Sequence, residues 1–107
     1  MTQDKAKRVL SALGLCRRAG KCVFGTDAVC EALRGGKLHY VATPADNSEN
    51  TRKKLTDKCS TYRVPLVELP VTGEELAHAT GRTGHAAAVG VADESFAQLL
   101  SKAVSDD

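Results

Sequence analysis

The sequence predicts an α/β fold in which a mixed or parallel sheet is sandwiched between helices. The 107 residues provide one domain with a modest core, so we expect a single domain over 1–107 with its core at about 4–104. Segments with helical spacing of apolar residues alternate with short apolar runs. Glycine, proline and capping residues separate these segments, which gives the order α-β-α-β-α-β-α-β-α.

The first third of the chain is expected to form a helix, a short strand and a second helix. Apolar residues at helical spacing over about 4–19 predict a helix that ends at Gly20. The apolar run 22–24 predicts a brief strand. Residues 25–27 have the turn and N-cap chemistry that begins a helix, and the glycine pair at 35–36 ends it.

The middle of the chain is expected to add a strand and a third helix. Residues 38–43 form an apolar, strand-like run, which Pro44 ends. Residues 46–49 have the form of a capping box, so the helix should begin there. Three residues are expected on the buried face of this helix: Leu55, Cys59 and Tyr62.

The last third is expected to form two strands and two helices. A strand over 65–69 is followed by a second capping box at 72–75, which opens a short helix that ends at Gly81. Residues 86–92 are nearly all apolar, which is typical of a strand buried on both faces. A final amphipathic helix is indicated by Phe96, Leu99, Leu100, Ala103 and Val104.

The charge pattern is more informative than the net charge of +2. Residues 1–21 hold six Lys or Arg against one Asp, and residues 52–63 hold five against one Asp. Clustered basic residues are typical of phosphate-binding surfaces, and a solvated, charge-balanced surface is the alternative. Four aromatic residues are too few for a protein that stacks single-stranded bases on exposed rings.

Other functional classes find little support. The longest apolar run, 86–91, is too short for a membrane span and no signal peptide is visible, so we expect a cytoplasmic protein without membrane contact. The four cysteines and three histidines match no zinc pattern, and no dinucleotide motif follows a strand. No nucleophile elbow is present. We therefore expect no metal, no cofactor and no enzymatic activity.

Two segments have the chemistry of a ligand site. The predicted helix start at 25–27 offers unpaired N–H groups and a close approach at Gly25, and cations precede it at Arg17, Arg18 and Lys21. A simple capped turn is the alternative. The loop 81–85 combines glycine, a cation, a hydroxyl and an imidazole, and its alternative is an ordinary connection between a helix and a strand.

The sequence resembles the L-seven-A-e / L-thirty-e ribosomal protein family, whose members bind kink-turns in RNA. The resemblance covers about residues 10–100 and rests on the order and spacing of several stretches. Residues 48–59 are most similar to a bacterial branch found in Firmicutes. The family's three-layer α/β/α sandwich agrees with the element order, so we expect that architecture with a mixed four-stranded sheet. The matching stretches are 17–21 leading to 25–26, then 32–38, 65 with its strand, 75–81 and 86–91.

The resemblance implies where RNA would bind and what differs here. Kink-turn binders carry Gly-x-Asn-Glu-x-x-Lys at the start of the second helix. Here Gly25 is retained, Asp27 replaces Asn, Ala28 replaces Glu and Glu31 replaces Lys, so two of the three readers are absent or reversed. The loop 81–85 matches the family's second contact region. The implied RNA-binding residues are Arg17, Arg18, Lys21, Gly25, Thr26, Asp27, Ala28, Arg82, Thr83, Gly84 and His85.

These observations favour a non-catalytic RNA-binding protein of the ribosomal-protein type. Its expected partner is structured RNA, including kink-turn or ribosomal RNA on the ribosome in translation, and the chain is expected to act as a monomer. Four cations favour this hypothesis: Arg17, Arg18, Lys21 and Arg82. Ala28 and Glu31 favour the alternative, a protein-interaction or regulatory adaptor that keeps the fold and has lost kink-turn binding.

Overall fold

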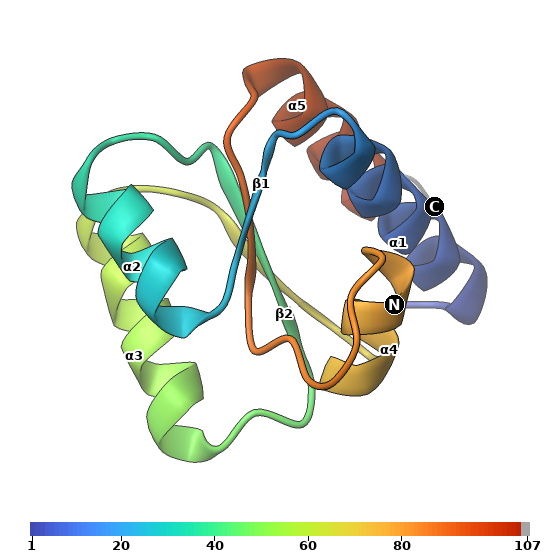
Figure 1. The fold of residues 1–107 in the computed structure, drawn as a ribbon, viewed down its shortest axis with the longest axis horizontal. Helices are drawn as coiled ribbons and strands as arrows, with labels where there is room; N and C mark the ends of the chain where they lie inside the picture. The colour runs from blue at the N-terminus through green and yellow to red at the C-terminus, as the bar shows by residue number, and fades with distance from the viewer. Residues whose placement is uncertain (106–107) are drawn as a thin grey trace.

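A mixed four-stranded sheet runs through the centre of the computed structural model, which describes residues 1–105 (Figure 1). The strand order is β1-β4-β2-β3, with β4 antiparallel to both β1 and β2, and β2 parallel to β3. This confirms the predicted mixed sheet. Residues 106 and 107 of the predicted domain lie outside the described residues. The strands are β1 (Cys22–Phe24), β2 (Tyr40–Pro44), β3 (Leu66–Leu69) and β4 (Val89–Val91).

Helices cover both faces of the sheet, which confirms the three-layer α/β/α sandwich (Figure 1). On one face lie α2 (Thr26–Arg34) and α3 (Glu49–Thr61). The other face is covered by α1 (Gln3–Arg18), α4 (Gly73–Ala79) and α5 (Glu94–Ser105). None of the helices within residues 1–105 combines the length and apolar character that crossing a membrane requires.

The core is divided between the two faces because side chains of a strand alternate. Tyr40 and Ala42 of β2 pack into the cluster under α1, α4 and α5, whereas Val41 packs with α2 and α3. On β4, Gly90 makes room for Leu38, since a Cβ at Gly90 would lie 2.6 Å from Cδ1 of that leucine. All three β4 residues are buried, as expected for a strand covered on both faces.

Two predicted strands have different bounds in the structure. The strand expected over 38–43 runs from Tyr40 to Pro44. The strand expected over 86–92 is limited to Val89–Val91, because the backbone of the residues before it bonds to the starts of α4 and α2. Ala86 donates its N–H to the Gly73 carbonyl, and Ala88 accepts from Gly25 N.

One capping box is confirmed and the other is wrong. Thr72 accepts from Glu75 N at 3.0 Å, and the Glu75 carboxylate accepts from Thr72 N at 3.0 Å. The box at 46–49 does not form, because Ser48 is the N-cap of α3 and Asp46 is bonded elsewhere.

Two apolar side chains that were expected to mark buried helix faces are exposed. The prediction that Tyr62 is buried is wrong, since its side chain is exposed. The helix α3 ends at Thr61, so Tyr62 does not continue its buried face. The helix α5 forms as predicted, but Leu99 lies on its solvent side and is 44% exposed.

Three connections meet at one edge of the sheet, here called the carboxyl edge. Because β1 and β2 are both antiparallel to β4 and β3 is parallel to β2, the strands β1, β2 and β3 all end there. The helices α2, α3 and α4 begin just beyond those ends, at Thr26, Glu49 and Gly73. The connection 80–88, which joins α4 to β4, returns to the same edge and places its backbone against all three.

Candidate nucleic-acid interface

The start of α2 has no side-chain cap. Its N-cap is Gly25, with φ +93° and ψ 155°, and no side chain accepts from its first turn. The helices α1, α3 and α4 are each capped by a hydroxyl, from Thr2, Ser48 and Thr72. The N–H groups and the partial positive charge at the start of α2 therefore face outward, as an anion-binding helix terminus requires.

Gly25 holds this helix start in place while leaving it open. Its N–H donates to the Ala88 carbonyl at 3.0 Å, which ties the start of α2 to the connection 80–88. No heavy atom lies within 4 Å of the position that a Cβ of Gly25 would occupy. A ligand can therefore approach the backbone closely, as was expected from the sequence.

Arg82 lies beside this helix start. Its guanidinium carbon is 4.5 Å from the centroid of the Phe24 ring, and Phe24 directly precedes Gly25. The backbone N–H of Arg82 donates to the Ala77 carbonyl at 2.8 Å, which anchors this residue to the end of α4. Stacking on a ring holds an arginine in place without neutralising it, so the cation stays available to an anion.

Arg17 reaches the same connection from the end of α1. A Cβ built on Gly81 would lie 3.1 Å from the Arg17 guanidinium carbon, so the guanidinium packs over this glycine. Gly81 has φ +73°, a conformation that suits glycine. The two arginines therefore lie on either side of Gly81 in the fold, although many residues separate them in the sequence.

The remaining predicted cations lie elsewhere. Lys21 precedes β1, where its carbonyl accepts from Ala92 N at 2.8 Å, whereas Gly25 follows β1 and bonds to Ala88. Lys21 and Gly25 therefore lie at opposite ends of β1. Arg18 lines a cleft of about 560 Å³ along α1, together with Lys7 and Ala79. The structure does not bring Arg18 or Lys21 next to the start of α2.

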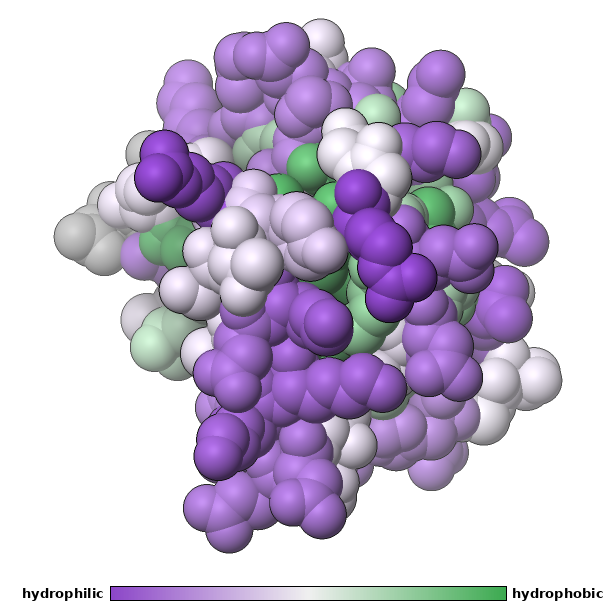
Figure 2. Space-filling model, turned by 90° about the vertical axis from the view of Figure 1, so that its left-hand side faces the viewer, coloured by the Kyte–Doolittle hydropathy of each residue, from purple (hydrophilic) through white to green (hydrophobic). Residues whose placement is uncertain are grey.

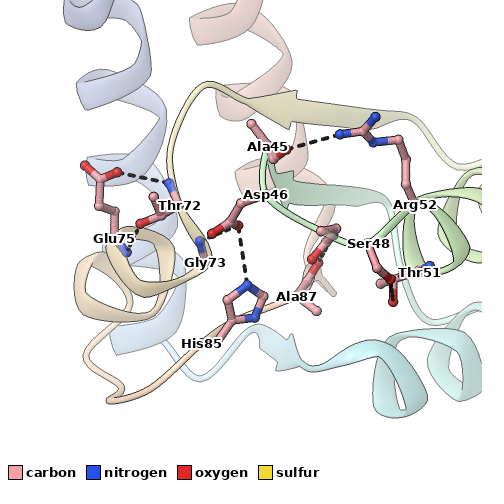
Figure 3. Close-up of polar contacts among 11 residues, drawn as sticks. Ala45, Asp46, Ser48, Thr51, Arg52, Thr72, Gly73, Glu75, His85 and Ala87 are labelled. Carbon is pink, nitrogen blue, oxygen red and sulfur yellow. Dashed lines mark hydrogen bonds and ion pairs between the residues drawn. The ribbon is translucent and has the colours of Figure 1, made fainter.

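His85 is part of a polar network that joins the β2–α3 connection, the start of α4 and the connection 80–88 (Figure 3). Asp46 Oδ1 accepts from Gly73 N at 2.8 Å and lies 3.4 Å from His85 Nε2. The Asn47 amide donates to the Ala87 carbonyl at 2.9 Å. Sequence reasoning assigned Asp46 and Asn47 to a capping box. Their role in holding the connection 80–88 depends on tertiary contacts that no local pattern indicates.

Thr83 and Gly84 are exposed and line a second cleft of about 740 Å³ between this connection and α4. Glu74, Glu75 and His78 lie on its other side. Arg82 also lines this cleft, so it lies between Phe24 and the carboxylates of α4.

Acidic side chains also lie on α2. Asp27 is fully exposed in the first turn, and Glu31 is exposed one turn further along. Lys54 of α3 places its Nζ 3.8 Å from Asp27 Oδ1. The start of α2 therefore carries a paired acid rather than an isolated one.

Three of the four cysteines are poorly suited to nucleophilic chemistry. Burial raises the pKa of the Cys16 and Cys22 thiols, and it raises the pKa of Cys59 to about 11. Thiols with a raised pKa are protonated near neutrality and react slowly. Across residues 1–105, no group of three or more His, Cys, Asp or Glu is arranged to hold a metal ion.

The fold is that of a known class of small protein. Residues 7–101 match the Ribosomal protein L7Ae/L30e/S12e/Gadd45 family, so the chain belongs to that family. Two curated relatives are named RNA-binding protein YlxQ. The one from Enterococcus faecium is 33% identical and the alignment covers 97% of this chain and 98% of the relative. The one from Bacillus subtilis is 38% identical, with 82% and 86% covered.

Solved structures agree with the family. A protein of unknown function from Bacillus halodurans is 30% identical and superposes with a TM-score of 0.86, covering 92% of this chain and 98% of the other. The 15.5-kD RNA-binding protein of Giardia lamblia shares the fold at 14% identity, with a TM-score of 0.81 and coverage of 97% and 88%. The predicted family and its Firmicutes branch are confirmed. The names of the relatives describe RNA-binding proteins and not enzymes.

Proposed function

We propose that this protein binds structured RNA without catalysing a reaction, and that it does so at the carboxyl edge. The observation that carries the proposal is the uncapped start of α2, with Arg82 stacked on Phe24, the residue that precedes Gly25. Arg17 adds a second cation to the connection 80–88, at Gly81. Exposed N–H groups beside fixed cations suit the phosphates of a folded RNA. The names of the two curated relatives support RNA as the ligand.

The proposed contacts fall into two groups. Gly25, Thr26, Asp27 and Ala28 present backbone and small side chains at the start of α2. The segment 82–85 presents a cation, a hydroxyl and open backbone at Thr83 and Gly84. We propose that Arg17 contacts phosphate beside Gly81, and that the more distant Arg18 and Lys21 act through longer-range attraction.

A kink-turn is the RNA we propose first, with ribosomal RNA as its cellular source and a monomer in the cytoplasm as the binding form. The chain has Asp27, Ala28 and Glu31 where kink-turn binders carry Asn, Glu and Lys. A charge-assisted hydrogen bond contributes about 1.5–3 kcal/mol, so we expect kink-turn affinity well below that of such binders. The arginines beside Gly81 retain the sequence-independent part of the binding.

A gel-shift comparison tests the proposal. The purified protein is titrated into a standard kink-turn RNA and into a plain duplex of equal length, at two salt concentrations. Tighter binding to the kink-turn supports recognition of that structure. Equal, steeply salt-dependent binding to both RNAs would overturn kink-turn recognition and leave RNA binding in place. Binding to neither RNA would overturn the proposed function.

The second candidate function is a protein-interaction adaptor. Ala28 and the exposed Glu31 favour it, because a carboxylate on the outer face of α2 repels phosphate. The absorbance ratio at 260 and 280 nm of the freshly purified protein separates the two candidates. With two tyrosines and no tryptophan, the chain absorbs weakly, and bound RNA raises the ratio strongly.

A further inference from the structure

The basic block on α3 is not explained by the interface described so far. The helix carries Arg52, Lys53, Lys54 and Lys58, and it begins at the carboxyl edge beside α2. Figure 2 shows the face where α2 and α3 lie, and hydrophilic side chains cover most of it. These four cations differ in what they contact, so we consider the role of each from its contacts.

Arg52 is engaged within the protein. Its Nε lies 2.9 Å from Glu68 Oε1 of β3, and its Nη2 donates to the Ala45 carbonyl at 3.1 Å (Figure 3). A guanidinium held at two points joins the start of α3 to the neighbouring strand. Arg52 therefore stabilises the edge, and these two contacts fix the position of its guanidinium.

Lys54 lies on the other side of α3, toward α2. Its Nζ is 3.8 Å from Asp27 Oδ1, and the two side chains are 50% and 101% exposed. A solvent-exposed pair at this distance contributes little to stability and opens readily. A lysine ammonium has three donors, so Lys54 can stay near Asp27 and still bind a phosphate oxygen.

Lys53 provides a natural comparison. It precedes Lys54 by one residue, which rotates it by about 100° around the helix. It is exposed, as Lys54 is, and it carries the same charge. Comparing variants of Lys53 and Lys54 therefore distinguishes a local role of Lys54 at the start of α2 from a general effect of positive charge on α3.

We propose that Lys54 is a phosphate-contacting residue, so that the RNA interface extends from the start of α2 onto the start of α3. This inference rests on the proposed function. The carboxylate of Asp27 stands in the first turn of α2, where alone it would repel a phosphate. Lys54 offsets that charge and places a cation at the same point. It thereby supplies from α3 the positive charge that α2, with Glu31, does not provide.

Matched substitutions test the assignment with the kink-turn RNA and the duplex as probes. We expect Lys54→Gln to weaken binding about three- to tenfold and to lower the log–log salt slope by about one. Lys53→Gln should change the affinity less than about twofold, and Lys54→Arg should retain it. Thermal unfolding of each variant checks that the fold is intact.

A double-variant series separates phosphate contact from mere neutralisation of Asp27. In an Asp27→Asn background, Lys54→Gln should still weaken RNA binding, because the phosphate contact remains to be lost. If the effect of Lys54→Gln disappears in that background, or equals that of Lys53→Gln, the assignment is overturned while RNA binding stands. If the unsubstituted protein binds neither RNA, the proposed function fails and this inference fails with it.

Discussion

Arg82, in the connection 80–88, lies over the ring of Phe24 in β1, with the guanidinium carbon 4.5 Å from the ring centroid. Phe24 is the last residue of β1, and Arg82 lies three residues beyond the end of α4. Their contact places a cation next to the uncapped start of α2. The aromatic ring therefore helps to set the position of an exposed charge.

Replacing Arg82 should weaken RNA binding more than replacing Phe24. Arg82→Ala removes a charge-assisted contact and should lower the affinity about tenfold. Phe24→Leu keeps the cation and removes only its support, so the loss should be a few-fold, in line with about 0.5–1 kcal/mol for an exposed cation–π contact. Gel-shift titrations at fixed salt measure both. A larger loss for Phe24→Leu than for Arg82→Ala would contradict this order.

Gly25→Ala should destabilise the protein by about 1–3 kcal/mol, because a residue with a Cβ is strained at φ +93° and ψ 155°. Space is not the cause, since nothing lies within 4 Å of the added carbon. Gly35→Ala is the matched control. Gly35 has φ −81°, and its added Cβ would meet neighbours at an ordinary 3.7 Å. Thermal unfolding of the two variants should show a loss for Gly25→Ala alone.

Gly73→Ala should displace His85, because the added Cβ would overlap the imidazole ring. The His85–Asp46 contact at 3.4 Å would then be lost, and hydrogen exchange in the connection 80–88 should become faster. In a His85→Ala background the overlap is absent. There Gly73→Ala should stabilise by up to about 1 kcal/mol, since alanine is the better helix former. Equal effects in the two backgrounds would exclude the ring as the cause.

Stability should fall at alkaline pH because of Cys59. Burial raises the pKa of Cys59 from 9.0 to about 11, so the unfolded chain loses its thiol proton before the folded protein does. Ionisation of the thiol therefore does not affect stability well below pH 9. The free energy of unfolding decreases as the pH rises from 9 toward 11. Melting temperatures across this range should fall less steeply for Cys59→Ala. A parallel decline in both proteins would assign the effect to other groups.

Local patterns predicted the element order well. They failed where a side chain forms a hydrogen bond with a residue far away in the sequence. Thr72 and Glu75 form their capping box because both bond within α4. The same pattern at 46–49 does not form a box, because Asp46 bonds to Gly73 N and its neighbour Asn47 bonds to Ala87. These partners lie 27 and 40 residues away, beyond the reach of any capping rule.

Only those parts of the candidate site that depend on local patterns were predictable. Gly25 and the segment 82–85 were expected from glycine, helix-start chemistry and the resemblance, and the structure bonds Gly25 to Ala88, three residues beyond that segment. Lys21 is close to Gly25 in sequence, but β1 carries the two apart. Arg17 reaches Gly81 because α1 packs beside α4, and Lys54 reaches Asp27 because α3 packs beside α2. Both depend on helix packing.

The connection 80–88 bonds to the start of α2 through Ala88, to the β2–α3 turn through Ala87 and to the start of α4 through Ala86. These bonds order the end of the connection before any ligand arrives. If RNA binds at this edge as proposed, more of the entropic cost of ordering falls on the RNA than on these residues. An RNA already bent to match the edge would then be favoured over one that must first be folded.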